Sequence, residues 1–346
     1  MTKRQTNYEL LRIISMCMVI TLHYLDKGKI LPELLGQMNI AGVLAWLLEA
    51  FCLVAVNVYV LISGYFLSQS EFHMQKLVRL WKQIFFYALV IGILALTLGL
   101  THPEEMNIYR MVYYFFPAVT NHYWFATSYL LLYVLVPFLN KGIQSMDKEK
   151  FGRLLGILLL FFSVAKTVIP ASLPYDDGGY NVLWFICLYL TGAYLKRFGS
   201  ELFFHKKKSM GLYLGSVSGI FLLTFALRAV FLQTGHLQDL VGYAYTYNHV
   251  LCFLGAVGLF TFFQRVRVPQ GRISDGIIKL SSATFGVYLI HEHVELRYVW
   301  PQWLHTEAVA GSLLWIPHWI FSVIVLYLIC SCIELLRQKL FVWMKL

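Results

Sequence analysis

A histidine and an arginine lie on one face of the first apolar segment of the chain. Arg12 and His23 are eleven residues apart, which in an α-helix is three turns plus about 20°, with a rise of about 16 Å. A desolvated histidine tends to stay neutral, and a neutral imidazole can take a proton from a hydroxyl whose oxygen attacks an acyl carbonyl. An arginine binds phosphate in bidentate fashion. The pair fits acyl transfer from a phosphate-bearing donor, although an arginine that reaches the membrane surface and a histidine bonded to a neighbouring helix would show the same spacing.

A second group of cations begins the third apolar segment. Lys76, Arg79 and Lys82 recur at spacings of three, so a helix would carry them all near its start. With that end in the cytoplasm, they could bind the phosphates of a cytosolic donor. The same residues are also explained as topogenic charge that is attracted to anionic lipid headgroups.

Polar residues inside other apolar segments are further candidates, because polar and charged side chains are costly at membrane depth. Glu49 enters the second segment from the outer surface at about the depth inferred for His23, where its carboxylate could orient the imidazole. It could equally pair with another cation. Asn57 and Ser63 follow in the same segment, and Ser15 belongs to the first.

Aromatic and histidine residues mark the ends of two further segments. Trp124 belongs to an aromatic run that begins the fourth segment and is typical of an interfacial belt. In the ninth segment His291 and Glu295 share a helix face, whereas His293 points elsewhere, so we expect no metal site there. None of the six cysteines forms a CxxC pair, and neither a disulfide framework nor a cysteine metal site is expected.

Membrane-spanning helices are the elements that must position these residues. Of the 346 residues, 59% are hydrophobic and 13% are charged, against about 25% charged in an ordinary soluble domain. A spanning helix needs about 20 largely apolar residues. Candidate segments lie near 8–26, 40–68, 78–100, 122–140, 151–170, 181–196, 211–233, 248–265, 278–297 and 312–336. We therefore predict an all-α polytopic membrane protein of about ten transmembrane helices, in which residues 1–346 form a single domain.

The basic residues follow the positive-inside rule. With the N-terminus in the cytoplasm, only Lys27, Lys29, Arg110 and Arg297 of the 28 lysines and arginines fall in outer loops. Three others lie within or at the edges of spans, and the remaining 21 fall in inner loops or at the termini. Both termini are therefore predicted to be cytoplasmic. The net charge of +10 is spread between apolar runs without a nucleic-acid-binding motif, so nucleic acid is not an expected partner.

Four motifs occur in a fixed order along nearly the whole chain. They are R-x10-H from Arg12 to His23 with Ser15 and Val19, then Leu61-Ile62-Ser63-Gly64-Tyr65-Phe66-Leu67, then Trp124-Phe125…Tyr129…Tyr133…Pro137, and finally Phe285-Gly286-Val287-Tyr288-Leu289-Ile290-His291. Each motif alone is weak, but in this order and on ten segments they are specific. Together they resemble the acyltransferase-3 family of bacterial membrane O-acyltransferases.

The resemblance implies a bacterial cell-membrane enzyme that moves an acyl group, usually acetyl from cytosolic acetyl-CoA, to a hydroxyl of an envelope or exported glycan. The family's catalytic histidine corresponds to His23 and its arginine to Arg12. Its cytoplasmic R-x-x-R motif, linked to donor binding, corresponds to Lys76-Leu77-Val78-Arg79. The lysine at the first position keeps the charge but lacks the bidentate fork, which leaves Lys76 in doubt as a phosphate ligand.

Some relatives carry a fused extracytoplasmic esterase-like domain. The chain ends shortly after the last predicted helix, so we expect the stand-alone form. That form would acylate its acceptor directly or pass the acyl group to a separate extracytoplasmic partner.

Three other function classes are compatible with a polytopic chain. A flippase for lipid-linked glycans would also carry intramembrane charge, but the inverted repeats and broken helices that transporters often show are not found in the sequence. A glycan polymerase or glycosyltransferase would usually have larger polar outer loops. A scaffold or sensor would give no reason for Arg12 and His23 to share a face.

Overall fold

The computed structural model describes residues 5–102, 107–120, 122–169, 176–199 and 205–344. Within these ranges every regular element is a helix, as the composition predicts. The chain divides into two compact units, which we describe separately. Unit 1 comprises Met1–Ile30, His73–Leu130 and Val268–Leu346, and unit 2 comprises Leu31–Phe72 and Leu131–Arg267.

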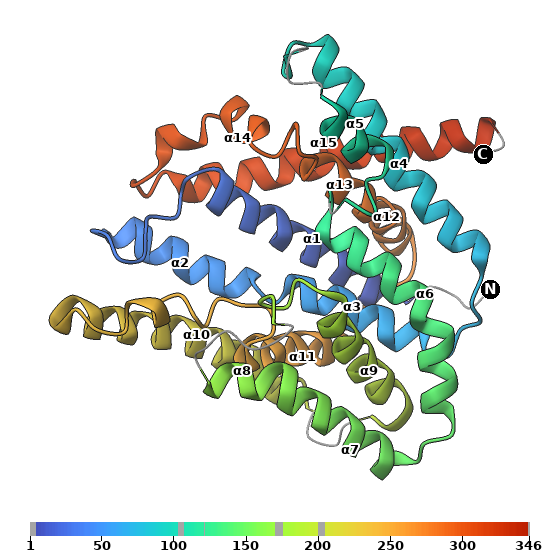
Figure 1. Cartoon of the computed structure of the whole chain (residues 1–346), viewed down its shortest axis with the longest axis horizontal. Helices are drawn as coiled ribbons and strands as arrows, with labels where there is room; N and C mark the ends of the chain where they lie inside the picture. The colour runs from blue at the N-terminus through green and yellow to red at the C-terminus, as the bar shows by residue number, and fades with distance from the viewer. Residues whose placement is uncertain (1–4, 103–106, 121, 170–175, 200–204, 345–346) are drawn as a thin grey trace. The chain divides into compact units, whose positions relative to one another are not determined.

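Unit 1 is built from the first helix, the helices around the third predicted span, and the last helices of the chain (Figure 1). Its helices are α1 (Thr6–Lys27), α4 (Met74–Thr97), α5 (Ile108–Phe115), the first part of α6 (Trp124–Gln144), α12 (Arg272–Ser281), α13 (Thr284–His291), α14 (Val299–Trp303) and α15 (Trp315–Trp343). Residues Thr306–Val309 form a short 3-10 turn before α15.

Helix α1 lies at the centre of the packing in unit 1. It contacts α12, α13 and α15. Near its start, the Thr6 hydroxyl lies 2.7 Å from the Ser274 hydroxyl of α12. Near its end, the Tyr24 hydroxyl lies 2.8 Å from Nδ1 of His318, which is close to the start of α15. Helices α1 and α15 are therefore antiparallel, and α1 begins at the end of the unit where α15 finishes.

Helices α12 and α13 form one bent element, with a 40° change of direction at the break between them. Gly286 of α13 faces Glu334 of α15 so closely that a Cβ atom at this position would lie 2.5 Å from the Glu334 Cγ atom. A side chain at Gly286 would therefore push α13 away from α15. The glycine of the ninth-segment motif is explained by this close approach, which small residues typically permit between membrane helices.

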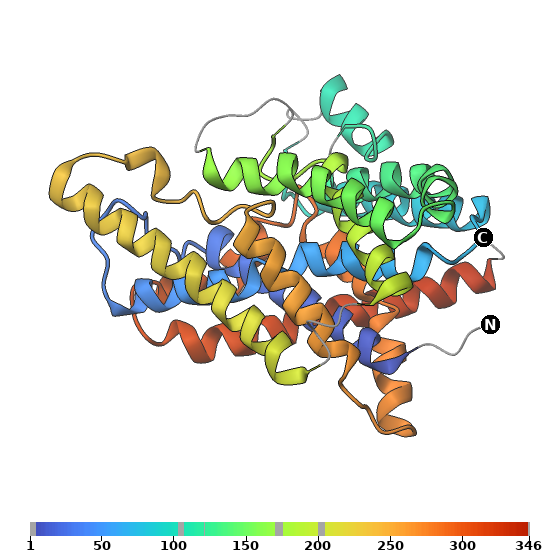
Figure 2. The same cartoon turned by 90° about the horizontal axis from the view of Figure 1, so that it is seen from below.

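Unit 2 is built around two helix pairs, α3 with α9 and α10 with α11, which lie side by side in both views (Figures 1 and 2). Its helices are α2 (Ile40–Cys52), α3 (Ala55–Leu67), the rest of α6, α7 (Lys148–Leu159), a π-helical turn (Leu160–Val164), α8 (Ala165–Val168), α9 (Val182–Phe198), α10 (Lys206–Thr234), a 3-10 turn (Gln238–Leu240) and α11 (Val250–Gln264).

Glycines allow α3 and α9 to cross at close range. A Cβ atom on Gly64 would lie 2.1 Å from the Tyr189 carbonyl oxygen, and one on Gly192 would lie 2.4 Å from the Leu61 carbonyl oxygen. Both helices therefore need glycine at the crossing. The Gly64 motif that closes the second predicted span is thus explained by packing within unit 2.

Each of the ten predicted segments contains helix among its described residues, but the ninth is helical only as far as His291, and the helices differ in length. Within the described residues, seven helices are long and apolar enough to cross a membrane, or eight if the bent α12–α13 pair is one span. Helix α9 has 17 residues and α11 has 15, both below the roughly 20 residues of a typical span. The protein is therefore a multi-pass membrane protein. A count of ten is not confirmed, and the cytoplasmic position of the termini stays a prediction.

Candidate active site

A cluster of ionisable side chains surrounds His23 near the end of α1. Nδ1 of His23 lies 3.0 Å from Nε2 of His291, the last residue of α13. The same Nδ1 lies 3.2 Å from the Glu292 Oε2 atom. The imidazole thus faces a second imidazole and a carboxylate from one neighbouring segment.

Glu292 balances two cations as well as the imidazole. Its Oε2 atom pairs with Lys27, which is one helical turn beyond His23 on α1. Its Oε1 atom lies 3.5 Å from Nη1 of Arg297. The Lys27 and Glu292 side chains are 9% and 6% exposed, so removing one partner would leave a buried, uncompensated charge. The charges therefore hold the end of α1 against the end of α13.

Local structure explains why these groups converge. Residues 23 and 27 are four apart and share a helix face. Nδ1 of His291 lies 2.6 Å from the Val287 carbonyl oxygen one turn earlier in α13, and the indole N–H of Trp300 donates to the His291 carbonyl oxygen at 3.1 Å. The end of α13 is thus capped and its last side chains are held in place.

A separate carboxylate, Glu295, lies three residues after Glu292, and both of its oxygens accept hydrogen bonds. Arg110 of α5 donates to both of its oxygens, at 2.8 Å each. The hydroxyls of Thr101 and Tyr114 also donate to this carboxylate. Burial, together with the bond to Glu295, raises the pKa of Tyr114 to about 12. This group ties α5 and the end of α4 to the segment after α13.

Arg12 lies at the other end of α1 and is paired with a residue that the sequence reasoning did not single out. Its Nη1 atom donates to the Glu9 Oε1 atom at 2.9 Å, and the Ser281 hydroxyl of α12 donates to the other Glu9 oxygen. The Arg12 side chain is 30% exposed and that of Glu9 is 7% exposed. Because α1 is one unbroken helix, Arg12 and His23 are about 16 Å apart along it. Ser15, between them, is fully buried.

The predicted donor-binding cations begin α4 in the same unit. Lys76 and Arg79 are exposed, and Lys82 is half-buried. Their exposure leaves them accessible to a ligand. Trp124, at the start of α6, is half-buried, and its ring centroid lies 5.9 Å from that of Phe125.

Asn57 and Ser63 belong to unit 2. The Asn57 amide donates to the Tyr247 carbonyl oxygen at 2.7 Å and accepts from the indole N–H of Trp184 at 3.0 Å. The Ser63 hydroxyl donates to the Tyr59 carbonyl oxygen one turn earlier, at 3.0 Å. Both side chains therefore hold helices of unit 2 in place.

Glu49 also belongs to unit 2, whereas His23 belongs to unit 1. The proposed contact between their side chains stays a prediction. Within unit 1, the carboxylate that lies beside His23 is Glu292. The signal that could have revealed it is its position directly after His291.

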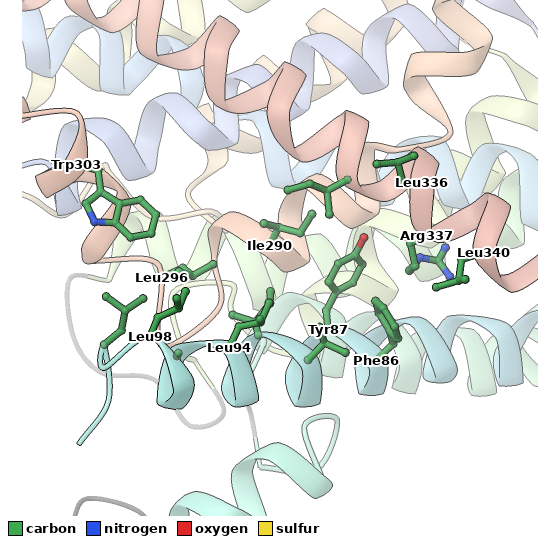
Figure 3. Close-up of a pocket in the computed structure, with 15 residues that line it drawn as sticks. Phe86, Tyr87, Leu94, Leu98, Ile290, Leu296, Trp303, Leu336, Arg337 and Leu340 are labelled. Atoms are coloured by element: carbon green, nitrogen blue, oxygen red, sulfur yellow. The ribbon is translucent and has the colours of Figure 1, made fainter. Parts of the chain in front are cut away.

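An apolar groove of about 570 Å³ runs along α4, α13 and α15 of unit 1 (Figure 3). Trp303 and Leu98 lie at one end of it, and Arg337 and Leu340 at the other. Its two polar lining side chains are already engaged. The Tyr87 hydroxyl donates to Glu334 at 2.7 Å, and Arg337 binds the same carboxylate through two nitrogens. The groove therefore suits hydrocarbon and offers poor contacts for the polar body of a nucleotide donor.

Among the described residues, no group of three or more histidine, cysteine, aspartate or glutamate side chains is arranged to hold a metal ion. The chemistry of the His23 cluster is that of proton transfer next to balanced charges.

The comparison with known protein families shows which family the chain belongs to. The sequence profile described as "Acyltransferase domain" matches residues 5–335. The chain belongs to the acyltransferase-3 family. No curated protein and no solved structure gave a significant match to the chain. As an acyltransferase-3 protein, it is a multi-pass membrane acyltransferase, with an acyl donor and an acyl acceptor.

Proposed function

We propose that this acyltransferase-3 protein transfers an acetyl group from cytosolic acetyl-CoA to a hydroxyl of a cell-envelope or exported glycan, with His23 as the general base. The observation that carries the proposal is the state of the His23 ring. Nδ1 is engaged by His291 and Glu292, and the side chain is 17% exposed. Within the described residues, Nε2 has no hydrogen-bond partner and is available to a hydroxyl.

The transfer needs one base and no oxidant or reductant. Nε2 of His23 takes the proton of the acceptor hydroxyl while the hydroxyl oxygen bonds to the thioester carbonyl carbon. The carbon–sulfur bond then breaks, and its electron pair stays on the CoA sulfur. The protonated imidazole returns its proton to that thiolate. The products are an O-ester, free CoA thiol and neutral His23.

The donor would bind by its phosphates to the cations at the beginning of α1 and α4. Arg12, Lys76, Arg79 and Lys82 all belong to unit 1, as His23 does. Lys76 and Arg79 are exposed, while Arg12 must share its charge with Glu9. The acyl thioester would extend from this end of α1 toward His23, and the acceptor would enter from the opposite side of the membrane.

The other candidate residues have supporting roles in this proposal. Glu49 belongs to unit 2, and its role as a second carboxylate for the imidazole stays a prediction. Asn57 and Ser63 hold helices of unit 2, and Ser15 and Trp124 belong to unit 1, as His23 does.

In this proposal the enzyme lies in the bacterial cytoplasmic membrane with both termini inside, as the distribution of lysines and arginines predicts. Residues 1–346 act in it as one transmembrane domain, among membrane lipids. The acceptor is acylated directly or through a separate extracytoplasmic partner.

Acyl transfer from radiolabelled acetyl-CoA tests the proposal in membranes that contain the protein. Mild alkali releases O-esters, so alkali-labile label measures the product. We expect label with the wild type and a loss of label with His23→Ala at equal abundance. His236→Ala is the matched control, because His236 is exposed and belongs to unit 2. Equal label in the wild type and in His23→Ala would remove His23 from the mechanism and favour a glycan flippase, which would move the glycan without acyl chemistry.

A further inference from the structure

Two residues beside His23 have a geometry that selects one of its two neutral tautomers. We propose that His291 and Glu292 are positioning residues that hold the proton of His23 on Nδ1, so that Nε2 is the basic atom. The inference rests on the proposed role of His23 as the base, and it can be tested separately from that role.

The first step concerns the proton of His291. Nδ1 of His291 lies 2.6 Å from the carbonyl oxygen of Val287. A carbonyl oxygen only accepts hydrogen bonds, so Nδ1 of His291 must carry a proton. In neutral His291 the other nitrogen, Nε2, then holds a lone pair and accepts.

The second step concerns the proton of His23, whose position follows from the tautomer of His291. Nδ1 of His23 lies 3.0 Å from Nε2 of His291, which carries the lone pair, and 3.2 Å from the Glu292 Oε2 atom. Both neighbours are acceptors, so Nδ1 of His23 must be the donor. In the reverse arrangement a charged His291 would donate to a bare Nδ1 of His23. That arrangement would direct a lone pair at the carboxylate and bury a further positive charge in the cluster.

The third step follows from exposure. The His23 side chain is 17% exposed, while His291 is 1% exposed. The lone pair on Nε2 of His23 is therefore the one that a hydroxyl can reach. His291 only orients the His23 ring. His291 does so as a neutral group and adds no charge of its own.

Glu292 acts when Nε2 takes up a proton. The charged groups that face His23 are Lys27 from α1 and Glu292 and Arg297 from the segment after α13. The two cations favour the neutral imidazole at rest. The carboxylate accepts a charge-assisted bond from Nδ1 once the ring is protonated. From α15, His318 bonds to Tyr24 and to the Leu304 carbonyl oxygen instead.

Nitrogen-15 NMR of histidine-labelled full-length protein in lipid bilayers reads the tautomer without any acyl transfer. The His23 signals are identified by their loss in His23→Gln. We expect a protonated Nδ1 and an unprotonated Nε2 in the wild type. We expect the same state in His291→Gln, because a glutamine carbonyl oxygen can replace the acceptor. In His291→Phe only the Glu292 carboxylate remains as an acceptor for Nδ1 among the described residues, so the population of the Nε2-protonated tautomer should rise above its wild-type level.

His318→Phe is the matched control. This histidine also joins α1 to a neighbouring segment, at 2.8 Å on each side, but it does not face His23. Its loss should leave the His23 signals unchanged. A wild-type His23 with its proton on Nε2, or unchanged His23 signals in His291→Phe, would overturn the inference.

Acyl transfer gives the second readout. We expect His291→Phe to lower the turnover roughly 10- to 100-fold, by analogy with the loss of an outer partner of a metal-bound histidine, with the KM for acetyl-CoA unchanged. His291→Gln should restore most of that loss. If the NMR result holds and His23→Ala still transfers label, the proposed function fails while the tautomer assignment stands.

Discussion

The sequence singled out a buried polar residue in each unit, Asn57 in unit 2 and His23 in unit 1. The two differ in whether a side-chain polar atom remains without a hydrogen-bond partner. The Asn57 side chain in unit 2 is fully buried and bonds through both atoms of its amide, to Tyr247 and to Trp184. The His23 ring in unit 1 uses only Nδ1 for its polar partners within the described part of the chain. A buried polar residue is thus a weak sign of function by itself. A reactive atom that the fold has left without a partner is a stronger one.

Glu295 shows that a buried charged residue is also a weak sign of function by itself. It lies close to Glu292 in sequence, yet both of its oxygens are saturated by Arg110, Tyr114 and Thr101. By the same criterion as Asn57, it is a structural group. Glu292 differs because its charge is directed at the imidazole that carries the available nitrogen.

The largest expected effect is the loss of acyl transfer when His23 is replaced. His23→Ala should lower acyl transfer about 10²- to 10⁴-fold, the usual contribution of a general base. The thermal stability should change little, because Lys27 and Glu292 remain paired. Transfer of label and the melting temperature are measured on the same purified protein. A variant that loses stability and activity in parallel would make His23 another structural group, like Asn57.

The next effect tests the opposite end of α1. Arg12→Ala removes a proposed phosphate ligand and should raise the KM for acetyl-CoA about tenfold. It should also destabilise the protein by about 1–3 kcal/mol, because it strips the partner from the buried Glu9 carboxylate while Arg12 itself is partly exposed.

The double variant Glu9→Gln/Arg12→Ala separates these two roles. It should recover the stability and keep the raised KM, as measured by chemical denaturation and donor titration. A KM that returns to the wild-type value would show that Arg12 only serves to neutralise Glu9.

A smaller effect is expected in unit 2. Asn57→Leu leaves the buried indole N–H of Trp184 without its acceptor, which should cost about 1–3 kcal/mol of unfolding free energy. The acyl transfer per folded molecule should stay at the wild-type level. Activity loss beyond the loss of folded protein would show that Asn57 takes part in the reaction.

The smallest effect is the pH dependence of stability that comes from Tyr114, which donates to the Glu295 carboxylate. The pKa of Tyr114 is raised to about 12, so the folded protein keeps the phenol proton above pH 10 while the unfolded chain loses it. The stability from this group is therefore fully present below about pH 10 and is lost as the pH rises toward 12, by under about 1 kcal/mol at pH 10.5. Melting curves of the wild type and of Tyr114→Phe should converge over this range. Parallel curves would show that Tyr114 is not held by Glu295.

The sequence predicted the helical positions well because apolar length is a local property. Each predicted segment contains helix among its described residues, and α1 carries Arg12 and His23 on one unbroken helix. The bend between α12 and α13 was not predicted, although the ninth segment carried polar residues. The sixth predicted segment, 181–196, is already short in the sequence, as α9 is in the structure. The short length of α11 is visible only in the structure, because helix ends depend on how the chain turns and packs.

The composition and the order of the motifs by themselves determined the class of protein: helical, membrane-spanning and related to the acyltransferase-3 family. They also determined which residues are costly to bury, since a charge in an apolar run is visible without any structure. Only the tertiary structure decided which partners they meet. His23 and His291 are 268 residues apart in the chain. Arg12, by contrast, meets Glu9 three residues earlier on its own helix, a pairing that helical spacing permits without any tertiary contact. Hydrogen bonds act over about 3 Å, so the direction of a lone pair is set by packing between helices and cannot be read from spacing along one of them.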